Sequence, residues 1–130
     1  MAPVFEHYAR QIHGKLNLIE LDGKNTKDEQ DKILSKLDPK AALIVLDERG
    51  KSLSSREFAS RMNDIQVQGQ SKIQFVIGGA DGLNDDIRSK AHLLLSFGNQ
   101  TWPHMMIRVM LIEQIYRAQQ ILSGHPYHRD

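Results

Sequence analysis

Residues 41–51 read AALIVLDERGK, an apolar run that passes directly into a polar segment with a glycine. Two further runs are built alike: IQFVI at 73–77 is followed by GGADG, and LLLSF at 93–97 is followed by GNQTWP. Short runs this rich in apolar side chains favour strands that are buried on both faces, as in a parallel sheet. We therefore expect three parallel strands, each ending in a polar or glycine-containing loop.

Outward from these runs, the spacing of apolar residues predicts helices between the strands. A further strand is expected at 16–21, and helices are expected at 4–12, 26–37, 54–65, 84–91 and 103–122. Residues typical of helix ends stand at these boundaries, namely Thr26 with Glu29, Ser54, Ser55, Asn84, Pro103 and Gly124. The alternation indicates an α/β fold, with a mostly parallel sheet flanked by helices, in a single domain over 1–130.

The composition is that of an ordinary globular protein, with 40% hydrophobic and 25% charged residues. The absence of cysteine excludes disulfides, zinc–thiolate sites and thiol catalysis. We find no apolar run long enough for a membrane span, no signal peptide and no metal-ligand cluster, so we expect a cytoplasmic protein without a metal. A net charge of +1 is low for a nucleic-acid binder, so any RNA contact must come from a local patch.

The last predicted helix has a broad apolar surface. Its apolar residues are Met105, Met106, Ile107, Val109, Met110, Leu111, Ile112, Ile115, Tyr116, Ala118, Ile121 and Leu122. One contact with its own sheet needs a narrower stripe, so a second buried face is expected. We interpret this face as a homodimer interface, and the alternative is a central helix in a monomer.

The loops at 47–51, 78–82 and 98–103 are expected to meet at the carboxyl edge of the sheet, where open α/β folds bind ligands. Their glycines permit positive φ and close backbone approach. The pattern is neither the dinucleotide fingerprint nor a phosphate-binding loop. Backbone groups with few charges suit a nucleoside or an S-adenosyl amino acid. The alternative is that Gly78 and Gly79 only make a tight turn.

The chain ends in GHPYHRD, residues 124–130, which gathers two histidines, a tyrosine and an arginine behind a proline. One interpretation is an ordered lid that carries an acid/base or RNA-contacting group. The other is a frayed tail without a role.

Four segments together carry a resemblance: LDERGKSLSSREFA, IGGADGL, TWPHMMIRVMLIEQIYRAQQI and GHPYHRD. In this order and spacing they resemble the SPOUT-superfamily methyltransferases that methylate N3 of a pseudouridine in large-subunit ribosomal RNA. The match covers nearly the whole chain, and the long-helix segment with the terminal PYHR is its most specific part. The resemblance implies a C-terminal trefoil knot, S-adenosylmethionine as cofactor, and active sites at a homodimer interface.

The resemblance also implies roles for individual residues. The cofactor contacts would be Leu46, Gly78, Gly79, Gly98, Asn99, Gln100, Thr101, Trp102 and Pro103. His128 and Arg129, with Tyr127 in the same motif, would serve the RNA end of the reaction. His104 and Arg108 match the start of the family's long helix, where a helix-start hydrogen bond and an interfacial ion pair are the structural alternatives. For Glu113 and Arg117, four residues apart, we expect a structural salt bridge.

The chain departs from the family in two places. The family opens with a short apolar strand ahead of the helix that begins near Pro3, and this sequence lacks it: either the start is assigned late, or the sheet has lost a strand. The family also has proline after the two glycines of the turn, where this chain has Ala80. Alanine is as small but does not fix φ, so a more flexible loop is expected.

The chemistry implied by the resemblance requires removal of the N3 proton of the pseudouridine. His128 is the candidate base, since histidine titrates near neutral pH, and Arg129 is the candidate anion stabiliser or phosphate clamp. The low net charge indicates that an assembled ribosome, rather than naked RNA, is recognised, with Arg49, Lys51, Arg56 and Arg129 facing phosphates. The alternatives are a SPOUT methyltransferase for another RNA such as tRNA, a non-catalytic ribosome- or RNA-binding module, and a doubly wound nucleotide-binding protein.

Overall fold

The computed structural model describes residues 2–11, 17–20, 27–69, 72–78, 83–98 and 103–124. The chain divides into two compact units. A sheet unit comprises Asn17–Ser52 and Gln70–Thr101, and a helical unit comprises Met1–Leu16, Leu53–Gly69 and Trp102–Asp130. Among the helices of the described ranges, none has the length and apolar character that a membrane crossing requires.

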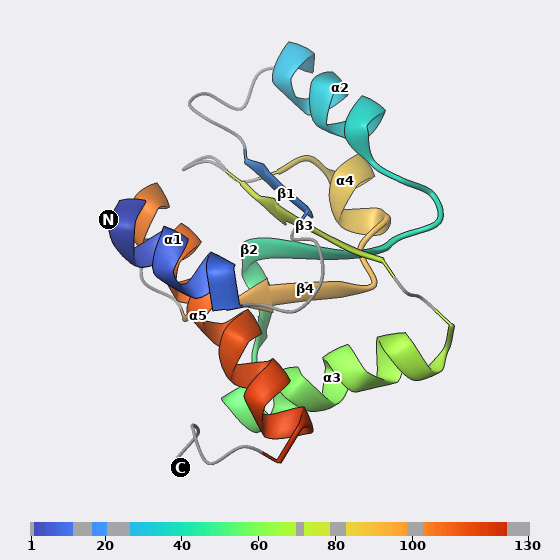
Figure 1. The fold of residues 1–130 in the computed structure, drawn as a ribbon. Helices are drawn as coiled ribbons and strands as arrows, with labels where there is room; N and C mark the ends of the chain where they lie inside the picture. The colour runs from blue at the N-terminus through green and yellow to red at the C-terminus, as the bar shows by residue number, and fades with distance from the viewer. Residues whose placement is uncertain are drawn as a thin grey trace. The chain divides into compact units, whose positions relative to one another are not determined.

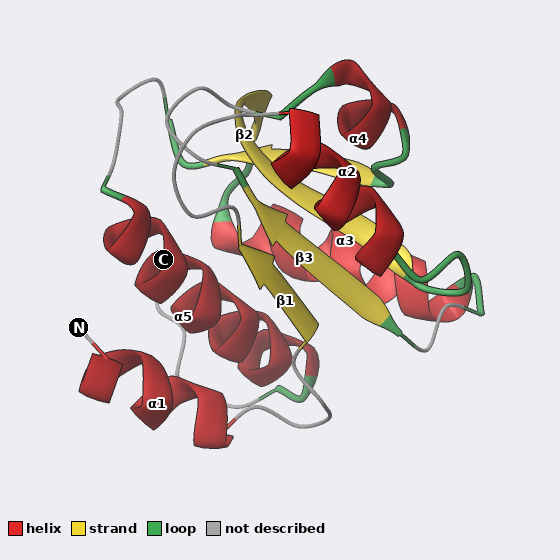
Figure 2. Ribbon diagram, turned by 90° about the horizontal axis from the view of Figure 1, so that it is seen from above, coloured by secondary structure: helices red, strands yellow, loops and turns green. Residues whose placement is uncertain are grey.

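The sheet unit contains four strands, β1 (Asn17–Glu20), β2 (Ala42–Ser52), β3 (Ile73–Ile77) and β4 (Leu93–Ser96). They lie in the order β1-β3-β2-β4, and every neighbouring pair is parallel (Figures 1 and 2). The predicted α/β architecture with a parallel sheet is therefore confirmed. The trefoil knot and the absence of a further first strand stay predictions.

Helices α2 (Lys27–Lys36) and α4 (Asp85–Ser89) cover one face of this sheet (Figure 2). Ile33 of α2 and Ile87 of α4 pack there with every second residue of the strands, namely Leu43, Val45 and Val76. The intervening strand residues Ile44, Phe75, Ile77 and Leu95 are buried too. The side chains on both faces of these strands are thus buried, as the dense apolar runs predicted.

β2 is longer than the sequence predicted. The prediction ended it at Leu46 and made 47–51 a loop, but the strand continues to Ser52. Leu46 and Lys51 both pair with Leu95, so the intervening residues form a bulge. A Cβ on Gly50 would lie 2.6 Å from the backbone carbonyl of Leu94, so only glycine fits this approach. The loop prediction was wrong because the bulge places Glu48 and Arg49 in solvent, which interrupts the apolar pattern.

The helical unit contains α1 (Ala2–Gln11), α3 (Ser55–Val67) and α5 (His104–Leu122). Both α1 and α3 contact α5. Between α1 and α5, the Tyr8 and Tyr116 ring centres lie 5.7 Å apart, and the Arg108 guanidinium lies 4.1 Å from the centre of the Phe5 ring. Between α3 and α5, Ser55 Oγ donates to Gln114 Oε1 at 2.7 Å. Part of the broad apolar surface of α5 is therefore covered within the chain, and the second face predicted for a partner chain stays a prediction.

The predicted helix ends agree closely with the structure. Ser54 forms a full capping box with Glu57, and Asn84 caps α4 by accepting from Ile87 N. Gly124, at φ +76°, follows the end of α5, as expected of a helix-stopping glycine. Thr26 lies outside the described residues.

Candidate functional site

Leu46 of β2 lies beside the carboxyl ends of β3 and β4 in the sheet unit. Leu46 of β2 pairs with Ile77 of β3 on one side and with Leu95 of β4 on the other. Because the strands are parallel, β3 ends at Ile77 and β4 at Ser96 on the same side of the sheet on which β2 bulges after Leu46, so Asp47, Gly78 and Gly98 lie at that edge. Leu46 is buried, and Gly78 and Gly98 are half-buried. The first contacts predicted in each of the three loops are thus brought together.

Gly98 turns the chain sharply where β4 ends. Its φ is +108°, a conformation that favours glycine. The Ser96 hydroxyl accepts from Gly98 N at 3.1 Å and donates to Gly98 O at 3.0 Å. Ser96 is buried, and sequence analysis did not single it out. The signal for it was a hydroxyl at the end of an otherwise apolar run, followed by glycine.

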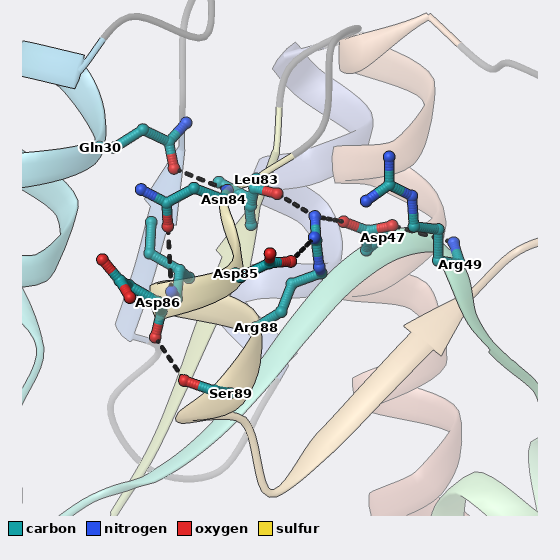
Figure 3. A network of polar contacts seen from close by, with 10 residues as sticks. Gln30, Asp47, Arg49, Leu83, Asn84, Asp85, Asp86, Arg88 and Ser89 are labelled. Atoms are coloured by element: carbon teal, nitrogen blue, oxygen red, sulfur yellow. Dashed lines mark hydrogen bonds and ion pairs between the residues drawn. The ribbon is translucent and has the colours of Figure 1, made fainter.

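Asp47 is a buried carboxylate directly after Leu46. Its side chain is 3% exposed. Arg49 N donates to Asp47 Oδ1 at 2.9 Å, which stabilises the bulge. Arg88 Nη1 lies 3.8 Å from Asp47 Oδ2. The negative charge of Asp47 is therefore met by a backbone amide and by a guanidinium of α4 (Figure 3).

Besides Asp47 of β2, Arg88 contacts residues at the start of its own helix, α4. Its Nη1 donates to the carbonyl oxygen of Leu83, and its Nη2 donates to the carboxylate of Asp85. Figure 3 shows the guanidinium between Leu83 and Asp47. The side chain of Arg88 is 17% exposed, whereas that of Asp85 is 93% exposed. Sequence analysis missed Arg88, although its position three residues after Asp85 on a helix favours an ion pair.

α2 supports the same region through one amide. Gln30 is buried, and its Oε1 accepts from Asn84 N at 3.0 Å. Asn84 Oδ1 accepts in turn from Ile87 N at 3.1 Å. Leu83 and Asn84, which follow the glycine-rich segment 78–82, are therefore held from two sides.

This arrangement offers backbone groups and little net charge. Gly78 and Gly98 are half-buried and have no side chain that would shield their backbone groups. The only buried acid found there among the described residues, Asp47, is compensated by Arg88. Within the ranges that the structure describes, no three His, Asp or Glu side chains gather as a metal site. The edge is suited to a ligand that is neutral or zwitterionic.

Of the other predicted site residues, the structure describes only Pro103. Pro103 is exposed and directly precedes α5 in the helical unit. The remaining predicted contacts and catalytic residues lie outside the described residues: Gly79, Asn99, Gln100, Thr101, Trp102, Tyr127, His128 and Arg129. Their roles stay predictions.

The sequence also predicted one salt bridge and a set of phosphate-binding basic residues. Arg117 Nη2 lies 2.6 Å from Glu113 Oε1 on α5, so the predicted structural salt bridge is confirmed. Arg49 and Lys51 are exposed on the extension of β2, and Arg56 is exposed on α3. Their role in binding phosphate stays a prediction.

Comparison with known proteins gives this edge a chemical context. A family model described as "Predicted SPOUT methyltransferase" matches residues 1–128. The chain belongs to the SPOUT methyltransferase family. The resemblance drawn from the sequence motifs is thereby confirmed at the level of the family.

Relatives of this SPOUT methyltransferase carry a more specific name. The chain is 48% identical over 133 residues to "Ribosomal RNA large subunit methyltransferase H" of Rhodospirillum centenum, which covers 97% of the chain and 88% of the relative. It is 52% identical over 103 residues to the protein of the same name from Mesorhizobium japonicum, which covers 79% of the chain and 64% of that relative. With the protein of that name from Chelativorans sp. it shares 58% identity over 89 residues, 68% of the chain and 51% of the relative.

Proposed function

We propose that this chain transfers a methyl group from S-adenosylmethionine to N3 of a pseudouridine in large-subunit ribosomal RNA. Membership in the SPOUT methyltransferase family supports the methyl transfer, and the relatives named as large-subunit ribosomal RNA methyltransferases support the substrate. The observation that carries the proposal is the meeting of Leu46, Gly78 and Gly98 at one edge of the sheet.

The chemistry of this edge fits the cofactor. A nucleoside can be bound by backbone amides and carbonyls, which Gly78 and Gly98 expose because they have no side chain. The sulfonium and the amino-acid group of S-adenosylmethionine carry positive and negative charges, so a binding edge without a large net charge is suitable. The contacts predicted at Gly79 and over 99–103 belong to the same proposal, on the resemblance alone, as does the trefoil knot.

S-adenosylmethionine supplies the methyl group when bound. The chain must hold the substrate base in line with that group and remove the N3 proton, because the protonated imide is a poor nucleophile. We assign proton removal to His128 and stabilisation of the imide anion to Arg129, with Tyr127 in the same terminal motif.

A homodimer completes the proposed enzyme. Met105, Met106 and Leu122 of α5 are 39%, 36% and 42% exposed, although α1 and α3 already pack on this helix. Exposed large apolar side chains on one helix support a surface that a second chain covers.

The proposed substrate is the assembled ribosome, encountered in the cytoplasm. The net charge of +1 gives little attraction for free RNA, while Arg49 and Lys51 on β2 and Arg56 on α3 offer a few phosphate contacts.

The test is transfer of tritium from methyl-labelled S-adenosylmethionine to ribosomes that lack the modification. We expect label in large-subunit RNA at a pseudouridine, at a much higher rate with ribosomes than with protein-free RNA. Label found only in tRNA would identify a different substrate. Absence of transfer to any RNA by a folded protein would refute the methyltransferase proposal.

A further inference from the structure

We propose that the ion pair between Asp47 and Arg88 positions the cofactor-binding edge, with Arg88 as the positioning residue that fixes the start of the β2 bulge, next to Leu46, relative to Leu83. The inference rests on the proposed function, because it assigns the pair a role in binding S-adenosylmethionine. Neither side chain is proposed to touch reacting atoms.

The ion pair lies next to the residue that we place against the cofactor. Asp47 directly follows Leu46, the residue that we place against the cofactor. Leu83, whose carbonyl accepts from Arg88, closes the segment that begins at Gly78. One guanidinium therefore connects the bulge of β2, at Asp47, with Leu83, which directly precedes Asn84 at the start of α4 (Figure 3).

Burying this ion pair costs desolvation free energy. Asp47 and Arg88 are 3% and 17% exposed, and removing both charges from water costs free energy that their attraction does not reliably return. Apolar residues of similar size often stabilise a fold better than a buried ion pair. A planar guanidinium with several fixed donors does, however, define geometry in a way that apolar packing does not.

The same unit contains a matched control at its other edge. Gln74 of β3 is buried, its Oε1 accepts from Asp38 N at 2.7 Å, and its Nε2 donates to Lys36 O at 3.1 Å. This side chain also joins two segments through two polar contacts. It lies at the amino end of β3, away from the proposed cofactor edge.

The experiment compares Arg88→Gln, Asp47→Asn and their double variant with Gln74→Met. Affinity for S-adenosylmethionine is measured by calorimetric titration, and the melting temperature is recorded for each protein. We expect Arg88→Gln and Asp47→Asn each to weaken binding by about tenfold or more, since small misplacements of binding groups are costly. The double variant should be no weaker than the poorer single variant, because both act through one contact. Gln74→Met should lower the melting temperature without changing affinity.

Kinetics separate positioning from loss of folded protein. In Arg88→Gln the KM for S-adenosylmethionine should rise, with a smaller change in kcat at saturating cofactor. Partial unfolding would lower the apparent kcat and leave KM unchanged. Arg88→Lys keeps the charge beside Asp47 but lacks the planar fork, so it should bind with intermediate affinity, and it serves where Arg88→Gln does not fold.

The inference is overturned if folded Arg88→Gln or Arg88→Lys binds S-adenosylmethionine as tightly as the unmodified chain. It is also overturned if Gln74→Met weakens binding equally. Failure of the unmodified chain to bind the cofactor would instead refute the proposed function, and that result would appear before any variant is made.

Discussion

The two edges of the sheet are stabilised by different kinds of polar contact. At the amino edge, the neutral amide of Gln74 joins β3 to the end of α2, and Leu43 N donates to His92 Nδ1 at 3.0 Å. At the carboxyl edge, a bulge, a glycine at positive φ and a buried ion pair occur together. The amino edge also has an ion pair, Lys72 Nζ to Asp38 Oδ2 at 3.9 Å, but it is exposed to solvent. The irregular backbone and the buried ion pair gather where we propose that the ligand binds, a distribution typical of functional sites.

The largest effect is expected at Gly50, on the carboxyl side. In Gly50→Ala the new Cβ would lie 2.6 Å from the backbone of Leu94, so β2 or β4 must move. Overpacking of this kind should reduce the free energy of unfolding by about 3 kcal/mol. Denaturant unfolding measures the loss. Gly69→Ala is the control, because Gly69 has open space around its Cβ position and, at φ +93°, should lose only about 1 kcal/mol through backbone strain. Equal losses in both variants would contradict the close approach.

The amino edge should respond in stability alone. Gln74→Met leaves Asp38 N and Lys36 O without their partner and should cost about 2 kcal/mol. Methyl transfer by the fraction that remains folded should be unchanged. Denaturant unfolding and single-turnover methylation check the two statements, and a fall in turnover beyond the loss of folded protein would remove the distinction between the edges.

Gly98 should affect binding more than stability. An alanine at φ +108° costs about 1 kcal/mol through backbone strain. Gly124→Ala, at φ +76° after α5, should cost a similar amount. Only Gly98→Ala should weaken S-adenosylmethionine binding in a calorimetric titration. Unchanged affinity in Gly98→Ala would exclude Gly98 from the cofactor site.

The smallest effect is expected at the start of α3, in the helical unit. Ser54→Ala removes the capping box and should cost roughly 0.5 to 1 kcal/mol. The Ser54 backbone N–H and the Ser54 side chain hydrogen-bond to Glu57 and lower the pKa of its carboxyl. The resulting stabilisation is complete above the pKa of Glu in the unfolded chain and is lost as pH falls through the lowered pKa. Thermal melts from neutral to acidic pH should show this loss in the unmodified chain and less of it in Glu57→Gln.

The strands and helices could be predicted because their local signals agree with the fold. The dense apolar runs became buried parallel strands, and Ser54, Asn84 and Gly124 stand at helix ends as their chemistry dictates. The extension of β2 could not be predicted, because the bulge exposes Glu48 and Arg49 and breaks the pattern on which strand prediction depends.

The candidate site was predictable where it depends on strand ends, and less so where it depends on pairing between distant residues. The meeting of the segments after Leu46, Ile77 and Phe97 follows from the rule that parallel strands present one common edge, whereas the individual contacts Leu46, Gly78 and Gly98 were assigned by the resemblance. The contact between Asp47 and Arg88 joins residues that are far apart in sequence, and their spacing contains no signal for it. Tyr127, His128 and Arg129 were assigned by resemblance alone and await direct tests.

The central claim, that the carboxyl edge binds S-adenosylmethionine, is tested most directly by titrating the cofactor into isotopically labelled protein and following backbone amide signals by NMR. The account predicts that the amides of Leu46, Asp47, Gly78 and Gly98 shift and saturate together, while those of Asp38, Leu43 and Gln74 stay in place. Saturating cofactor that moves none of the carboxyl-edge signals, or that moves chiefly those of the amino edge, would contradict it.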